Sequence, residues 1–187
     1  VMSSVPQLFE EVLAAYDARI EQGQIAVHRD FSDVGPLAAF PSELRQVFSN
    51  LVLNAIEAIS GSGNIYIRVR YGHDGQEREG IRVIVADDGC GISQENMPQI
   101  FEPFFTTKDS KGTGLGLWVS QGIVQKHQGS LRVRSRTDEA RHGTCCSVFL
   151  PFATHDASAE DMPVASHDQA QDVMTKSASS GDDRSAA

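Results

Sequence analysis

A carboxylate followed by a glycine-bearing turn is the first group of residues in this chain that could bind a ligand. Asp87 ends an alternating apolar run, residues 81–86, and is followed by Gly89 and Gly91. The alternation predicts a strand that delivers the Asp87 carboxylate directly into the turn. That carboxylate can accept hydrogen bonds from an exocyclic amine, and the two glycines would let a flat ring approach the backbone closely.

A second glycine-rich stretch suits an anion. Gly112, Gly114 and Gly116 alternate just before an apolar helical pattern that includes Leu115 and Leu117. The first backbone N–H groups of a helix are unpaired and the helix dipole is positive there, so glycines at this place make a site for phosphates. Two unrelated glycine turns would be the simpler explanation, and a third element of the chain argues against it.

The third element is a predicted helix, residues 42–59, in which Asn50 and Asn54 share one face. Apolar residues recur through this helix with helical period and predict a buried side. Asparagine is a poor helix former, and two of them on an otherwise apolar helix carry a cost. Their neutral carbonyl oxygens can coordinate a hard cation that also holds phosphates, usually Mg²⁺. The alternative is a pair of exposed asparagines.

Helices and strands must hold these three groups in place. The periodicities predict helices over residues 5–20, 42–59 and 114–127, and strands over 25–31, 65–71, 81–86, 131–135 and 144–150, with a short strand over 37–39. Turn residues separate them, at Gly23, at 61–64, at 72–75 and at Gly129. Strands in one layer with helices in the other make a two-layer α/β sandwich.

Composition sets limits on the domain and its partners. The chain has 187 residues, a net charge of −9 and 40% hydrophobic residues, which suits one domain of about 150 residues plus a tail. We place the domain at residues 1–152. Residues 153–187 lack aromatics and are rich in Ala, Ser and Asp, so we expect a disordered acidic tail or a linker, for example to a receiver domain. The negative charge argues against nucleic acid, and no apolar run suits a membrane.

The order and spacing of these stretches resemble the ATP-binding catalytic domain of sensor histidine kinases, within the superfamily that includes DNA gyrase B and the Hsp90 chaperones. Asn50-x-x-x-Asn54 looks like the family's N box and Asp87-x-Gly89-x-Gly91 like its first glycine box. Residues 101–108, Phe-Glu-Pro-Phe-Phe-Thr-Thr-Lys, look like its F box, in wording closest to the nitrogen-regulation and PAS-linked kinases. Gly112-x-Gly114-x-Gly116 looks like the second glycine box, and Gly143-Thr144 like a weak last box.

This resemblance covers residues 5–151 and implies a fold and a site. The fold would be the Bergerat fold, a mixed sheet of about five strands backed by three helices. Residues 93–111 would be a mobile ATP lid, fastened by Phe101, Phe104 and Phe105 when nucleotide binds, although these could equally be ordinary core aromatics. The nucleotide-binding residues would be Asn50, Asn54, Asp87, Gly89, Gly91, Ile92, Lys108, Lys111, Gly112, Thr113, Gly114, Leu115, Gly116, Leu117 and Thr144.

The resemblance also assigns roles within that site. Asp87 would read adenine, while Asp88 beside it is interpreted as a turn residue. Asn54 and Asn50 would hold Mg²⁺, and the catalytic residues would be Asn50, Lys108 and Lys111, whose lysines would meet a terminal phosphate. Many sensor kinases carry a lysine three residues after the second asparagine. Glu57 stands there in this chain, which leaves more of the phosphate contact to the lid lysines.

Asn50 indicates what happens to the ATP. In the hydrolytic relatives a glutamate at this position activates water, whereas a neutral asparagine cannot take a proton at pH 7. The domain is therefore expected to transfer the γ-phosphate elsewhere. The resemblance implies that the acceptor is a histidine on a separate dimerisation domain in two-component signalling, with a response regulator receiver domain as a further partner. None of the six histidines lies in a phosphoacceptor context, so the acceptor domain would precede Val1.

Two alternatives and a location complete the predictions. A serine-phosphorylating anti-sigma factor, or a regulatory nucleotide-binding module of the same fold, would carry the same motifs. A gyrase-like or chaperone ATPase is a third candidate, and Asn50 argues against it. The three cysteines form no metal pattern and fit a reducing compartment. We expect the fragment in the cytoplasm, as part of a longer protein that could be membrane-anchored.

Overall fold

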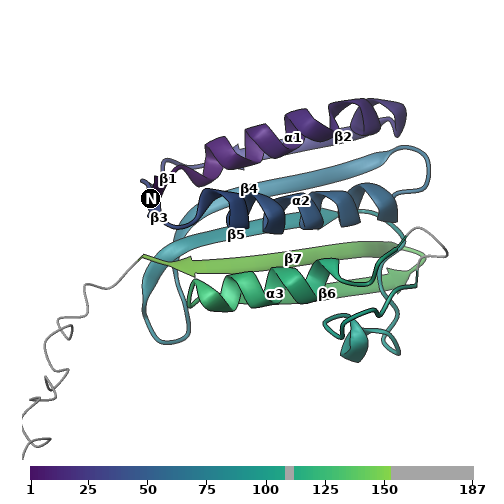
Figure 1. Ribbon diagram of the computed structural model, residues 1–187. Helices are drawn as coiled ribbons and strands as arrows, with labels where there is room; N and C mark the ends of the chain where they lie inside the picture. Colours follow the sequence, from purple (N-terminus) through teal and green to yellow (C-terminus); the bar gives the residue numbers. More distant parts are fainter. Residues whose placement is uncertain (108–111, 153–187) are drawn as a thin grey trace, which may run out of the picture. The chain divides into compact units, whose positions relative to one another are not determined.

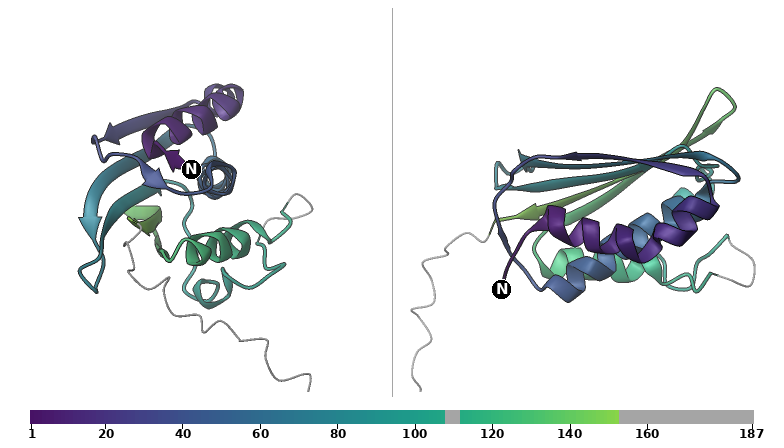
Figure 2. Two further views of the ribbon diagram at one scale, coloured as in Figure 1. Left: turned by 60° about the vertical axis from the view of Figure 1, so that its left-hand side comes forward. Right: turned by 90° about the horizontal axis from the view of Figure 1, so that it is seen from above.

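The computed structural model describes residues 1–107 and 112–152, which form a five-stranded sheet with helices on one of its faces (Figure 1, Figure 2). The helices are α1 (Val5–Gln22), α2 (Pro41–Ala58) and α3 (Gly116–Lys126), and a short 3₁₀ turn covers Met97–Gln99. The strands of this sheet are β2 (Ile25–Phe31), β4 (Gly63–His73), β5 (Glu79–Asp87), β6 (Ser130–Asp138) and β7 (Arg141–Pro151). The predicted two-layer α/β sandwich is confirmed.

The sheet is mixed, as predicted. Its strand order is β2-β4-β5-β7-β6, with β2 parallel to β4 and the other neighbours antiparallel. The parallel pair needs a crossover, and α2 supplies it between β2 and β4. The ends of β5 and β7 meet at Asp87, which is paired with Thr144. The carboxylate of the first glycine box is therefore placed beside the last predicted box.

The buried side chains that alternate along the central strands form one side of the core. Ile65, Ile67 and Val69 of β4 are buried and point toward the helices, while residues between them are more exposed. The two long helices meet over this layer, where Phe9 of α1 stacks on Phe48 of α2 with ring centroids 4.2 Å apart. No described helix covers the other face of the sheet (Figure 2). One face is packed and the other is open, as is common for antiparallel sheets.

The N-terminus adds a small second sheet. β1 (Met2–Ser3) pairs antiparallel with β3 (Leu37–Ala38), which brings the chain start beside the segment that leads into α2. The strand around residue 37 was predicted, and Leu37 is buried. Its partner β1 was not predicted.

Two kinds of boundary differ from the sequence prediction. α3 begins at Gly116 instead of Gly114, because Gly114 has a φ of +66° and cannot belong to a right-handed helix. His73 was predicted in the turn at 72–75, and His142 falls between the predicted strands 131–135 and 144–150, but both lie in strands. His73 pairs with Glu79 at the end of the β4–β5 ladder, and His142 pairs with Thr137 in the β6–β7 ladder. Tertiary pairing extends these strands beyond their apolar alternation.

Some predictions fall outside the described residues. Lys108 and Lys111 belong to the gap at 108–111, and the predicted tail at 153–187 follows the last described residue. The domain boundary at residue 152 therefore stays a prediction. For the described part of the chain, none of the helices has both the length and the apolar character needed to cross a membrane.

Candidate nucleotide-binding site

Asp87 lies at the end of β5 with its carboxylate held by two backbone groups. Its Oδ1 accepts hydrogen bonds from the Gly89 N–H at 2.9 Å and the Thr144 N–H at 3.3 Å. Both bonds use the same oxygen, and within residues 1–107 and 112–152 no partner is found for Oδ2. Burial raises the pKa of Asp87 above its usual 3.8, against the effect of these two bonds, and the charge of Asp88 adds to the rise. A half-buried carboxylate with one oxygen available can receive an amine donor.

The two glycines of the first box are explained by packing. A Cβ on Gly89 would lie 2.6 Å from the carbonyl carbon and oxygen of Ala58, at the end of α2. A Cβ on Gly91 would lie 2.0 Å from the carbonyl oxygen of Arg136 in β6, and Gly91 also has a φ of +74°. Protein backbone occupies the space that we had expected these glycines to leave for a ring. The first glycine turn therefore packs closely between the end of α2 and the β6–β7 hairpin.

Two residues that the sequence analysis did not select hold the same turn. The Ser135 Oγ accepts from the Ile92 N–H at 2.7 Å, donates to the Gly143 carbonyl at 2.8 Å and lies 2.9 Å from the Thr144 Oγ1. The His142 Nδ1 lies 2.8 Å from the Gly89 carbonyl oxygen, to which it must donate. No local pattern marks Ser135 or His142, since their roles depend on β6 and β7 returning to the turn.

Asp88 is more than a turn residue, because it ties the turn to β4. Its Oδ1 accepts from the Asn64 N–H at 2.7 Å and its Oδ2 from the Asn64 Nδ2 at 2.7 Å. The Asn64 Oδ1 in turn lies 3.0 Å from the His28 Nε2, so His28 donates to it. Burial alone would raise the pKa of Asp88, but the bonds from Asn64 outweigh it and lower the pKa below 3.8. Adjacent carboxylates thus have opposite pKa shifts.

Asn50 connects α2 to α3. Its Nδ2 donates to the Gly116 carbonyl oxygen at 3.1 Å and to the Ser120 Oγ at 3.1 Å. Because a carbonyl oxygen can only accept, this contact fixes which end of the amide is nitrogen, and Oδ1 is the atom left to hold a cation. Asn54 is half-buried one turn further along α2. Glu57 lies 3.7 Å from Arg19 of α1 in an exposed ion pair.

The second glycine box meets the F box. The Phe104 N–H donates to the Gly114 carbonyl oxygen at 3.0 Å, and a Cβ on Gly114 would lie 2.3 Å from the Phe104 carbonyl carbon. Phe104 itself has a φ of +67° and is 76% exposed, so it is not a core aromatic. Phe101, by contrast, is partly buried and packs against the core. Gly112 and Thr113 precede this contact, and Leu115 caps α3, with Gly116 and Leu117 as its first residues.

The predicted residues therefore form two groups joined by α2. Asp87, Gly89, Gly91, Ile92 and Thr144 gather around the first glycine turn. Asn50 and the second glycine box gather at the start of α3. The Cys90 N–H donates to the Ala58 carbonyl oxygen at 2.9 Å, which anchors the first group to the end of the helix that carries Asn50 and Asn54.

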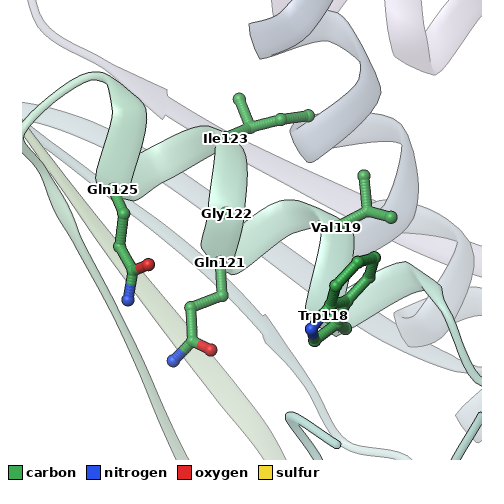
Figure 3. Close-up of a pocket in the computed structure, with 6 residues that line it drawn as sticks. All are labelled: Trp118, Val119, Gln121, Gly122, Ile123 and Gln125. Atoms are coloured by element: carbon green, nitrogen blue, oxygen red, sulfur yellow. The ribbon is translucent and has the colours of Figure 1, made fainter. Parts of the chain in front are cut away.

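A cavity of about 430 Å³ lies elsewhere, along α3 (Figure 3). Trp118, Gln121 and Gln125 project from this helix beside it, and Trp118 is 47% exposed. The described residues that line it are neutral and belong to α3 alone. It contains none of the residues predicted to bind nucleotide, so we do not assign the ligand there.

Comparison with known proteins agrees with this geometry. Residues 40–154 match the family described as "Histidine kinase-, DNA gyrase B-, and HSP90-like ATPase". Signal transduction histidine-protein kinase AtoS of Escherichia coli is 38% identical over 150 residues, 80% of this chain and 23% of that protein. Sporulation kinase E of Bacillus subtilis is 32% identical over 148 residues, 79% of this chain and 19% of that protein. The chain thus spans about a fifth of the length of these relatives.

Solved structures show the same fold. The nucleotide-free catalytic domain of the histidine kinase ThkA aligns with a TM-score of 0.70 at 29% identity, over 81% of this chain and 94% of that one. ThkA in complex with the response regulator protein TrrA aligns with a TM-score of 0.67 at 26% identity, over 82% of this chain and 42% of that one. The chain belongs to the histidine kinase-, gyrase B- and HSP90-like ATPase family. The predicted resemblance to the ATP-binding domain of sensor histidine kinases is confirmed.

Proposed function

We propose that this domain binds Mg-ATP and transfers the γ-phosphate to a histidine on a separate dimerisation domain, as part of two-component signal transduction. The observation that carries the proposal is the pairing of the Asp87 site with a neutral Asn50. Asp87 presents an acceptor oxygen for an adenine amine. Asn50 supplies no general base, and its amide already bonds to α3. The site suits holding ATP for another acceptor more than hydrolysing it.

The donor atoms present fit a magnesium ion bound together with phosphates. Hard cations take oxygen ligands, and Mg²⁺ retains several waters when only one or two protein groups bind it. Asn50 has Oδ1 available by the orientation of its amide, and Asn54 lies four residues further along the same helix. Within the described residues no group of three or more His, Cys, Asp or Glu could hold a metal. Mg²⁺, when bound, would neutralise phosphate charge, while Asn50 and Asn54 would orient it.

The described histidines support an acceptor on another domain. His28 bonds to Asn64 and His142 to Gly89, while the His127 Nδ1 lies 2.9 Å from the Ile123 carbonyl oxygen. His73 lies 3.7 Å from Glu79 at the end of β4. Each is engaged in the fold of this domain. His155 and His167 lie outside the described residues.

The partners follow from the same reasoning. ThkA, a histidine kinase with this fold, has been solved with a response regulator. We propose a receiver domain of that kind as the downstream partner, and a histidine-bearing dimerisation domain as the direct substrate. The chain's net charge of −9 disfavours nucleic acid. We expect the domain to act in the cytoplasm, where ATP is available.

A transfer experiment in trans tests the proposal. The chain is mixed with the histidine-bearing region of its own full-length protein and radiolabelled Mg-ATP. We expect an acid-labile, base-stable phosphate on that region, and neither self-labelling nor rapid ATP turnover by the chain alone. Fast hydrolysis by the isolated chain would favour a gyrase-like ATPase. An acid-stable product on serine would favour an anti-sigma-type kinase.

The metal assignment has its own test. Asn54→Ala should weaken Mg²⁺-dependent ATP binding about tenfold, because it removes one of the few protein oxygens near the metal. Binding of metal-free nucleotide should change little. Calorimetric titration with and without Mg²⁺ separates the two. An equal loss in both titrations would make Asn54 a structural residue.

A further inference from the structure

The arginines of the β6–β7 hairpin differ from the other arginines of the domain. The others are engaged: Arg19, Arg29, Arg45, Arg68, Arg70 and Arg78 form ion pairs with acids, and Arg82 donates to the His73 carbonyl oxygen and covers the Phe149 ring. Within the described part of the chain, Arg132, Arg134, Arg136 and Arg141 form no ion pair. All four are exposed. Among the residues that the structure describes, the arginines without an ion pair or another side-chain partner are therefore concentrated on one hairpin.

Three of these arginines surround a pocket. A cavity of about 250 Å³, which we call the hairpin pocket, is lined by Arg134, Arg136 and Arg141 together with Ala86 and Cys145. Ala86, Cys145 and Arg134 form one row across β5, β7 and β6, because Cys145 is the register partner of both others. The remaining lining residues belong to the first glycine turn or contact it: Asp87, Ser135, His142, Gly143 and Thr144.

The hairpin pocket lies on the open face of the sheet. Val85, Cys146 and Val133 form the neighbouring row and face the core. Since side chains alternate along a strand, Ala86, Cys145 and Arg134 face the opposite side, away from the helices. Burial raises the pKa of the Cys145 thiol, the charge of Arg134 opposes this rise and the charge of Asp87 adds to it. The pocket therefore has a small apolar floor with three arginines around it and the Asp87 turn on one side.

Edge protection explains only part of this arrangement. β6 is an edge strand, and charged side chains on such a strand prevent pairing with other chains. Arg132, Arg134 and Arg136 would serve that purpose. Arg141 lies on β7, which is not an edge strand of the sheet, at a residue that pairs only with Asp138 of β6, and it lines the same pocket. Asp87 lines the pocket, Asp138 ends β6 and Glu139 lies in the hairpin turn, and none of these acids forms an ion pair with the arginines in the described structure.

Guanidinium groups bind phosphate through paired N–H donors, and three of them suit an anion with several oxygens. The volume exceeds what one phosphate needs, and the floor of Ala86 and Cys145 suits a small carbon group. We propose that the hairpin pocket binds a phosphorylated small molecule, with its phosphate among Arg134, Arg136 and Arg141. The pocket borders the Asp87 site and shares lining residues with it, while the side chains of its three arginines lie on the open face of the sheet.

Titration of the whole chain with glycerol 3-phosphate tests the proposal, followed by backbone and arginine Nε–H resonances at about 0.15 M salt. We expect saturable shifts at residues 134, 136, 141 and 145. Glycerol, the matched neutral probe, should give none. Inorganic phosphate should shift the same residues more weakly, and equal affinity for it would reduce the site to one for free phosphate. Shifts confined to residues 88–92 or 112–117 would overturn the proposal, as would no saturation.

Two charge-matched variants sharpen the test. The triple variant Arg134→Gln, Arg136→Gln, Arg141→Gln should bind glycerol 3-phosphate at least about tenfold more weakly. The control triple variant Arg19→Gln, Arg29→Gln, Arg45→Gln removes the same charge elsewhere and should bind within about twofold of the original chain. Equal losses in both would mean general charge attraction and no site. ATP binding, measured in parallel, reports on the fold and on the Asp87 site independently.

A second readout uses the cysteine at the pocket floor. In a Cys90→Ser background, Cys145 is the accessible thiol, because Cys146 is buried. Glycerol 3-phosphate should slow the reaction of Cys145 with a neutral disulfide reagent severalfold, and glycerol should not. An unchanged rate at concentrations that saturate the resonance shifts would place the ligand away from the pocket.

Discussion

The two glycine boxes look alike in sequence but are held differently by the fold. Gly89 and Gly91 approach the backbone of Ala58 in α2 and of Arg136 in β6, two elements of the central fold. The three atoms nearest to a Cβ on Gly114 belong to the backbone of Phe104, an exposed residue in the predicted lid. The first box is thus built into the domain, and the second is built against a segment that leads into residues 108–111.

This difference fits the role that we propose for each box, the first in binding the base and the second in binding the phosphates. A base site gains affinity when it is already in its bound geometry, so the turn around Asp87 benefits from rigid neighbours. A phosphate site that must open for exchange benefits from a partner that can move. Both boxes need glycine for close backbone contact, but a change in the first should destabilise the whole domain and a change in the second should mainly affect the predicted lid.

The largest effect is expected at Gly91. Gly91→Ala would place a Cβ 2.0 Å from the Arg136 carbonyl oxygen at a φ of +74°. We expect a loss of roughly 2–4 kcal/mol in the free energy of unfolding, from backbone strain and overpacking together. Urea denaturation measures it. Gly75→Ala is the matched control, since nothing lies within 4 Å of its Cβ position. Similar stability of both variants would contradict the rigid role of the first box.

Asp87→Asn should separate binding from stability. It exchanges an acceptor oxygen for a donor that faces the adenine amine, so ATP affinity should fall by about 1–3 kcal/mol, or roughly ten- to a hundredfold. Calorimetric titration measures it, with GTP as the control nucleotide. The fold should not weaken at pH 7, because the variant removes a carboxylate whose ionised form is disfavoured by burial.

The pH dependence of Asp87 has a definite sign. Because its folded pKa is raised, the ionised carboxylate destabilises the native state above that pKa, and protonation relieves this as the pH falls through it toward 3.8. The original chain should therefore gain stability relative to Asp87→Asn on acidification. A difference in unfolding free energy that does not change between pH 7 and pH 4 would argue against a buried, ionised Asp87.

Asp88→Asn should behave in the opposite way. Both carboxylate oxygens of Asp88 accept a hydrogen bond from Asn64, and an asparagine amide has only one oxygen to accept them. The free energy of unfolding at pH 7 should therefore fall by about 1 kcal/mol. Because the folded pKa of Asp88 is lowered, its contribution is present above 3.8 and is lost as the pH falls through the folded pKa. The original chain should lose its advantage over this variant on acidification. Parallel pH curves for the Asp87 and Asp88 variants would refute the contrast.

The smallest effects are expected in the second box. Gly114 has a φ of +66°, and a Cβ at this residue would lie 2.3 Å from the Phe104 carbonyl carbon. Gly114→Ala should therefore break the contact between residues 104 and 114, at a local cost of roughly 1 kcal/mol. Gly116→Ala meets nothing closer than the Asn50 side chain at 3.7 Å and should cost a few tenths of a kcal/mol or less. Hydrogen exchange at residues 101–107 should rise in the first variant alone, while residues 81–86 stay protected. Loss of protection in the strand as well would show that this box is also built into the core.

The local sequence determined most of the architecture. Helical period placed the buried face of α2, alternation placed β5 and β7, and glycines marked both turns, so the layers and the family could be predicted. These signals are local because apolar spacing has to match the geometry of one helix or one strand. The order of Asn50, Asp87 and the glycines was enough to indicate a nucleotide site.

Only the tertiary structure decided how the site is held. Ser135 and His142 contact the first glycine turn because β6 and β7 return to it, 43 and 53 residues away along the chain. The same long-range packing explains why Gly89 and Gly91 must be glycine, and why Arg141 shares a pocket with Arg134. Such contacts depend on strand register and on which faces meet. The spacing of residues along a single helix or strand determines neither the register nor the faces that meet, so these contacts could not be predicted from the sequence.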